Sequence, residues 1–106
     1  MPVVPSGIVN QRQLATAVQK AADALAPDVV RIRYGLTSDS TGSAAIFFRV
    51  LLSDRASGPS SLYKTAERIT AKILEVVQPR EKFGVEAYFN FRSESEQAEL
   101  QDAAWE

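Results

Sequence analysis

The chain of 106 residues contains no cysteine and no histidine. Without cysteine it can form no disulfide, no thiolate nucleophile and no cysteine-ligated zinc site. Without histidine it lacks the usual base of a catalytic triad, the imidazole metal ligand and the side chain that titrates near neutral pH. The composition therefore predicts a protein with no metal site and no cofactor, and it argues against catalysis without excluding it.

A strong charge of one sign is also lacking. Twelve basic and thirteen acidic residues give a net charge of −1, so the surface has no general excess of positive charge for binding nucleic acid regardless of sequence. The hydrophobic share of 45% is typical of a globular protein. The opening Met-Pro-Val-Val-Pro has neither the basic start nor the apolar run of a signal peptide, and no stretch is as apolar and long as a membrane span. We therefore expect a soluble, cytoplasmic protein.

Hydrophobic periodicity predicts a helix over 11–25, followed by a strand over 29–34. Asn10 is a suitable N-cap, with Gln13 placed as in an approximate capping box, and Pro27 ends the helix. The helix carries one apolar stripe, formed by Leu14, Val18, Ala21, Ala22 and Leu25. Polar, turn-forming residues then predict a long hairpin loop over 35–43.

The second half of the chain alternates in the same way. Strict alternation predicts a strand over 44–53, a helical stripe predicts a helix near 60–77 that Pro79 ends, and a third strand covers 84–92. Residues 1–9 can form an arm or a short edge strand. Residues 93–106 form an acidic tail or a short helix, for which Ser93 and Glu96 have the spacing of a capping box.

These elements predict a single α+β domain over 1–106, with the order α-β-β-α-β. Two amphipathic helices with one apolar stripe each can cover only one face of a small sheet, so we expect a two-layer sandwich with both helices on the same face. A strand within 1–9 would complete the β-α-β-β-α-β order of a ferredoxin-like fold, with its split β-α-β arrangement.

The uncovered face of the sheet is the candidate functional site. If the helices cover Ile32, Phe48 and Phe89, alternation places arginines and aromatic residues on the opposite face, with an apolar centre at Phe47, Leu51 and Tyr88. The candidate residues for a partner or nucleic acid are Arg31, Arg33, Phe47, Arg49, Leu51, Tyr88 and Arg92, accompanied by Glu86 and Asn90.

Three interpretations of this face compete. It could be the interface of a homo-oligomer, with a dimer favoured, or of a complex with another protein, since arginine and tyrosine are enriched at interface centres. The acidic tail could instead fold over the arginines as counter-charge. The face could also bind single-stranded RNA, with Phe47 and Tyr88 stacking on bases and the arginines holding phosphates. The neutral composition favours a non-catalytic interaction module.

Two features are compatible with an enzyme. The chain begins Met-Pro, and tautomerases that resemble this general β-α-β layout use an N-terminal proline as base, a role that Pro2 would take here with an arginine orienting a carboxylate substrate. We expect instead that this proline belongs to an arm. Asp39 lies among Ser, Thr and Gly, and we interpret it as the first residue of an Asx-type turn, because no second carboxylate lies nearby in the sequence.

Overall fold

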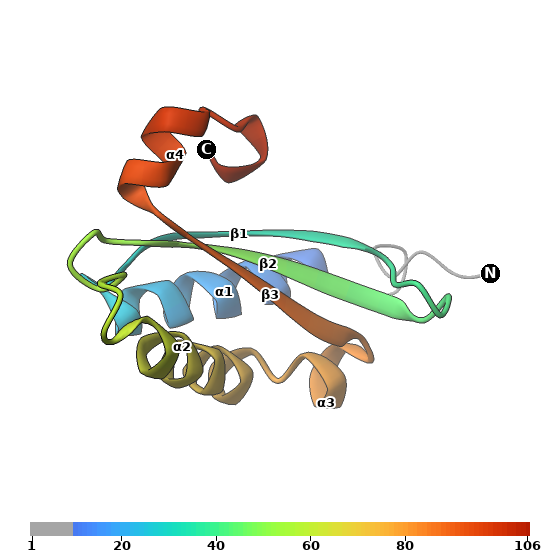
Figure 1. The fold of residues 1–106 in the computed structure, drawn as a ribbon. Helices are drawn as coiled ribbons and strands as arrows, with labels where there is room; N and C mark the ends of the chain where they lie inside the picture. The colour runs from blue at the N-terminus through green and yellow to red at the C-terminus, as the bar shows by residue number, and fades with distance from the viewer. Residues whose placement is uncertain (1–9) are drawn as a thin grey trace.

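The computed structural model describes residues 10–106, which form an open three-stranded sheet with helices on both of its sides (Figure 1). This part of the chain is α+β, as the periodicity predicts. The elements are α1 (Gln11–Leu25), β1 (Val29–Ser38), β2 (Ala44–Leu52), α2 (Leu62–Val77), α3 (Pro79–Phe83), β3 (Glu86–Ser93), α4 (Glu94–Leu100) and the 3-10 helix η2 (Ala103–Trp105).

Helix α1 begins where the sequence predicts, because its N-cap forms. The side chain of Asn10 accepts a hydrogen bond of 2.9 Å from the backbone N–H of Gln13, which satisfies one of the free donors of the first turn. The predicted apolar stripe is buried at Leu14, Val18, Ala21 and Leu25. It packs against β1 and α2, so α1 is fixed on one face of the sheet.

Strand β1 is longer than predicted, and the prediction of a hairpin loop over 35–43 was wrong. The strand continues to Ser38, with Gly35, Leu36 and Thr37 paired to β2. The turn is confined to the segment after Ser38, where the backbone N–H of Asp39 bonds the carbonyl of Ser43 at 2.9 Å. Cross-strand pairing with the strongly β-forming β2 overrides the weak propensity of a Gly-Leu-Thr-Ser sequence.

The three strands are arranged in the order β1-β2-β3. Strands β1 and β2 form an antiparallel hairpin, and β3 pairs directly with β2 in parallel, from Ala45 and Glu86 to Leu52 and Ser93. A parallel pair needs a crossover connection, and α2 provides it. Because β2 and β3 are adjacent, the described residues do not show the split arrangement that we expected. The N-terminal strand of that expectation lies outside the described residues.

The hydrophobic core lies between the sheet and the two long helices. Figure 1 shows α1 and α2 together beneath the sheet, as predicted, while α4 and the C-terminus lie above it. On β2, Ile46, Phe48, Val50 and Leu52 are fully buried beneath the sheet. The rings of Phe48 and Phe89 stack at 5.0 Å, which extends the core onto β3. The predicted assignment of the sheet faces is therefore correct.

Helix α2 ends at Val77, as predicted, but the sequence did not indicate its cap or the short helix that follows. Gln78 adopts a left-handed conformation with φ of 50° and donates its backbone N–H to the carbonyl of Leu74, which caps the helix. Pro79 then occupies the first turn of the short helix α3 and does not simply follow the end of α2. Proline is well suited to this position, because the N–H that it lacks would have no partner in a first helical turn.

Candidate functional site

On the upper face of the sheet, opposite α1 and α2, three of the rows of residues that run across the strands contain the candidate residues. The first row is Gly35, Phe47 and Tyr88; the second is Arg33, Arg49 and Asn90; the third is Arg31, Leu51 and Arg92. Every candidate residue predicted from the sequence lies in one of these rows. The structure thus brings all seven onto one face, but it divides them between two environments.

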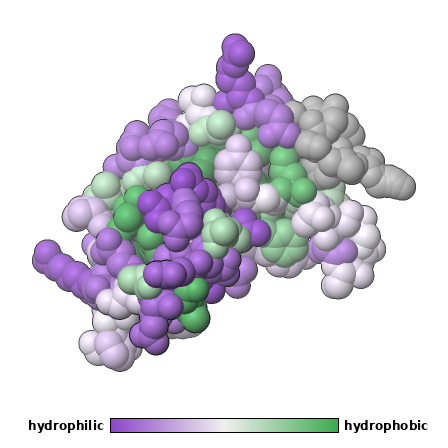
Figure 2. Space-filling view, turned by 90° about the horizontal axis from the view of Figure 1, so that it is seen from above, coloured by the Kyte–Doolittle hydropathy of each residue, from purple (hydrophilic) through white to green (hydrophobic). Residues whose placement is uncertain are grey.

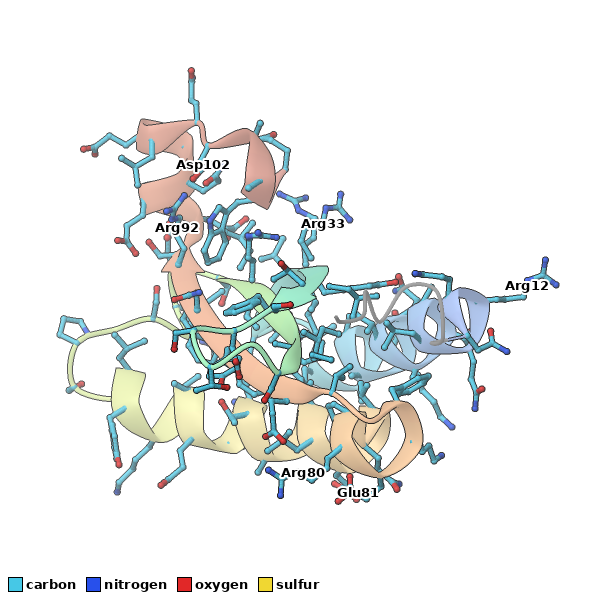
Figure 3. The ribbon with its side chains drawn as sticks, turned by 90° about the vertical axis from the view of Figure 1, so that its right-hand side faces the viewer. Arg12, Arg33, Arg80, Glu81, Arg92 and Asp102 are labelled. Carbon is cyan, nitrogen blue, oxygen red and sulfur yellow. The ribbon has the colours of Figure 1, made fainter. Side chains whose placement is uncertain are left out.

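The third row is covered by the C-terminal segment, which we define as residues 94–106. Leu51 is only 4% exposed. The prediction that it belongs to the apolar centre of an uncovered face was therefore wrong. The Nε of Arg31 donates to the carbonyl of Trp105 at 3.3 Å, and Arg92 lies against the ring of the same tryptophan, 4.4 Å from its centroid. Figure 3 shows Arg92 beneath this segment, close to Asp102.

The segment is held mainly by uncharged groups. Arg92 donates to the side-chain carbonyl of Gln97 at 2.9 Å, and Gln97 donates in turn to the carbonyl of Asp102 at 2.8 Å. Among the described residues, the one ion pair between the segment and the arginines joins Arg92 to Asp102 at 3.6 Å. Of the three interpretations, cover by the acidic tail thus holds for the third row alone, and carbonyl groups and an aromatic ring take the place of most of the carboxylates that it assumed.

Helix α4 positions this cover, and its start was predictable. The Ser93 side chain accepts from the backbone N–H of Glu96 at 3.1 Å, and the Glu96 side chain accepts from the backbone N–H of Ser93 at 3.1 Å. This capping box confirms the short C-terminal helix. Trp105, 7% exposed, and Gln97 are the residues that sequence reasoning missed as site residues. The sole tryptophan in an otherwise acidic tail was the available signal for Trp105.

The first and second rows stay open, and we call their six residues the open patch: Arg33, Gly35, Phe47, Arg49, Tyr88 and Asn90. The rings of Phe47 and Tyr88 stack with centroids 5.0 Å apart, and Tyr88 is 40% exposed. Figure 2, which looks onto this side of the molecule, shows hydrophobic surface beside the hydrophilic side chains. An exposed stacked aromatic pair is costly for a surface that only meets water.

Arg49 has an unusual position within the open patch. A Cβ atom added to Gly35 would lie 3.8 Å from Nη1 and 3.9 Å from Nη2 of Arg49, so the guanidinium lies across β1 above the glycine. Arg33 is directly opposite Arg49 in the register. Within residues 10–106, no carboxylate forms an ion pair with either arginine. Among the described residues, the one hydrogen bond of these two guanidinium groups joins Nε of Arg33 to the carbonyl of Glu106 at 2.8 Å.

The Asp39 turn closes the far end of the open patch. Asp39 Oδ1 accepts from the backbone N–H groups of Thr41 and Ser43, which confirms the Asx-type turn. Its Oδ2 accepts from the hydroxyl of Tyr88 at 2.7 Å. Hydrogen bonds from Thr41 and then Tyr88 lower the pKa of Asp39 to about 2, and the same bond raises the pKa of Tyr88 above its ordinary value. Asp39 therefore orients the Tyr88 ring and is occupied as an acceptor.

Within 10–106, no three acidic side chains group as in a metal site, and no helix is long and apolar enough to cross a membrane. Pro2, the residue of the tautomerase hypothesis, lies outside the described residues. Comparison of the chain with models of protein families, with curated proteins and with solved structures finds no match.

Proposed function

We propose that this domain is a non-catalytic interaction module whose open patch binds a segment of another protein. The patch combines two arginines that have no ion-pair partner among the described residues with two stacked, partly exposed aromatic rings. Arginine and tyrosine provide much of the binding energy at protein interfaces. A partner that presents carboxylates beside apolar side chains would satisfy both kinds of group.

The observation that carries the proposal is the position of Arg49. Its guanidinium lies above Gly35, within 4 Å of where a Cβ atom of that residue would be, and makes no hydrogen bond with residues 10–106. By contrast, Arg92 is already engaged by Gln97, Asp102 and the Trp105 ring. A planar guanidinium that the described residues leave unengaged can bind a carboxylate through two parallel hydrogen bonds.

The boundaries of the open patch suggest the size of the partner. The C-terminal segment limits one end, at Arg33, and the Asp39 turn limits the other, at Tyr88. Because Leu51 is covered, the apolar area is smaller than a broad domain interface would need. The space between these limits fits a single helix or extended segment.

A selection from a displayed library of random peptides tests this function. We expect the protein to select peptides with Asp or Glu beside aromatic or aliphatic residues. Their affinity should fall at least about tenfold in Tyr88→Ala and in Arg49→Glu, because the substitutions remove a central aromatic contact and reverse the binding charge. Tyr63→Ala is the matched control, since Tyr63 is also exposed but lies on α2. Affinity would be measured by titration calorimetry.

Two outcomes would overturn the proposal. Selected peptides that bind the wild type, Tyr88→Ala and Arg49→Glu equally would show that the open patch is not the binding surface. The second outcome would favour the RNA interpretation: no acidic peptide is selected, and a single-stranded RNA oligonucleotide binds at low salt. That binding would weaken steeply as salt rises and would be lost in the same two variants.

A further inference from the structure

The outer edge of β3 has no partner strand within residues 10–106. Strand β3 pairs with β2 along one side, and the sheet ends there. Natural proteins usually protect such an edge with charge, proline or a bulge. The middle of β3, residues 87–91, is Ala-Tyr-Phe-Asn-Phe, which contains no charge and no proline. The edge is thus well suited to pair with another strand.

Exposed apolar residues of α2 lie along the same edge. Leu74 borders a shallow hollow with Glu86 and Ala87, and Leu62 borders another with Phe91. Tyr63, 79% exposed, lies on the same flank as the 41% exposed Leu74, because they are eleven positions, or about three helical turns, apart. The opposite flank of α2, which faces α1, carries Arg68, Lys72 and Glu75.

Half of the large hydrophobic residues exposed in the described part of the chain lie on α2 along this edge. They are Leu62, Tyr63 and Leu74, whereas Tyr88 is on the upper face of β3, and Val30 and Leu100 lie elsewhere. In Figure 1, β3 and α2 lie together at the front of the molecule, so strand and helix form one surface. A contiguous surface that combines free backbone groups with apolar side chains indicates an interface.

We propose that a second copy of this chain docks on this edge, with the two β3 strands antiparallel about a two-fold axis at Phe89. The two sheets would then join into one sheet of six strands. The proposal does not depend on peptide binding by the open patch. It uses the backbone edge of β3 and the exposed flank of α2, whereas the side chains that Tyr88 and Asn90 contribute to the open patch lie on the upper face.

The sequence of β3 favours this register. Antiparallel pairing centred on Phe89 places Glu86 opposite Arg92 of the second copy at both ends, and Tyr88 opposite Asn90 of the second copy. Parallel pairing in register would place like charges together, which is destabilising. Glu86 is already bound by Arg80 at 2.7 Å, and Arg92 by Asp102 at 3.6 Å, so the new contacts would extend two existing ion pairs.

The helix layer has the same symmetry. Leu74 lies beside Ala87 and Leu62 beside Phe91, so the middle of α2 lies at the level of Phe89. A two-fold axis there would bring the two α2 helices together in antiparallel orientation. Leu74 of each copy would then contact Tyr63 of the other copy. A single axis thus pairs the strand edges and buries the apolar flanks, as an isologous dimer requires.

Sedimentation equilibrium tests the dimer. We expect the wild type to sediment at twice the mass of one chain, and Leu74→Lys to raise the dissociation constant at least about 100-fold, because two unpaired charges would be buried at the interface. Leu74 is exposed in the single chain, so the variant should still fold. Leu100→Lys is the control, since Leu100 is exposed on α4, away from this edge. A monomeric wild type, or equal behaviour of the two variants, would overturn the proposal.

Cross-linking tests the register, with no natural cysteine to interfere. Tyr88→Cys and Asn90→Cys chains, mixed and mildly oxidised, should give a disulfide-linked dimer faster than either chain alone, because the register places position 88 opposite position 90. If either single variant cross-linked as fast as the mixture, the proposed register would be overturned. Arg49→Glu should leave the dimer intact, while Leu74→Lys should keep peptide binding, so failure of one proposal is distinguishable from failure of the other.

Discussion

Gly35 determines where the guanidinium of Arg49 can lie. A Cβ at Gly35 would meet Arg49 at 3.8 Å, which is an ordinary contact, but a longer side chain would occupy the space of the guanidinium itself. We therefore predict that Gly35→Leu displaces Arg49 and weakens binding of a selected acidic peptide about tenfold. Stability should not fall, because glycine is a poor residue for a strand.

The control for this prediction is Gly35→Ala, whose methyl group fits beside Arg49. Peptide titration and urea denaturation of the three proteins would separate the two effects. Equal peptide affinity in wild type and Gly35→Leu would contradict the role that we assign to the position of Arg49 above Gly35.

The bond between Tyr88 and Asp39 predicts a particular pH dependence. The pKa of Asp39 is lowered from 3.8 to about 2, so the stabilisation that its hydrogen bonds provide is complete above pH 3.8. It is lost as the pH falls toward 2, where the carboxylate is protonated. In Tyr88→Phe the carboxylate loses one donor, and we expect its pKa to rise toward the ordinary value.

A titration of the Asp39 carboxyl carbon by NMR would measure this change. Tyr63→Phe is the control, because Tyr63 makes no side-chain hydrogen bond with the described residues. The Tyr88 phenol should ionise above its usual pKa, because ionisation would break its hydrogen bond to Asp39 and would also place two negative charges together. If the Asp39 pKa were the same in wild type and Tyr88→Phe, the bond would not persist in solution.

At the scale of elements, the C-terminal segment depends on Trp105. Truncation of a tryptophan in a protein core costs about 3–5 kcal/mol. Here the segment can detach while the core between the sheet and the two long helices remains, so we predict a smaller loss of about 1–2 kcal/mol for Trp105→Ala. Amide exchange should accelerate in residues 94–106 and stay slow in α1 and β2. Leu100→Ala, at an exposed position of the same segment, should change neither quantity.

Global loss of protection in Trp105→Ala would contradict this prediction, because it would make the segment part of the main folding unit. If the segment does detach, Leu51, Arg31 and Arg92 become accessible. The open patch would then extend over all three rows, and the variant should bind hydrophobic dyes more strongly than the wild type.

The elements could be predicted where local signals are strong. Asn10 caps α1 and Ser93 caps α4 as their sequences indicate. Local signals failed in β1, where pairing with β2 extends the strand through Gly35, and at α3, where Pro79 starts a helix after the left-handed Gln78. In both places a neighbouring element, and not the local sequence, determines the conformation.

At the scale of the whole molecule, alternation predicted the faces of the sheet but not the order of its strands. The side-chain period of two fixes which residues share a face, so all seven candidate residues are on one side. No such rule states that β3 is adjacent to β2, or that the C-terminal segment covers Leu51 and leaves Phe47 open. These features depend on contacts between residues that are far apart in the sequence.

The direct pairing of β2 with β3 has a consequence during synthesis of the chain. The hairpin of β1 and β2 can form as soon as residue 52 has left the ribosome, whereas β3 is complete only after residue 93. During that interval the inner edge of β2, with its fully buried Ile46, Phe48 and Val50, has no partner strand. Non-local pairing of this kind is slow and exposes the nascent chain to aggregation. We therefore expect that stalled chains from which residue 52 but not residue 93 has emerged from the ribosome recruit chaperones, and that chains stalled after complete emergence of residue 93 do not.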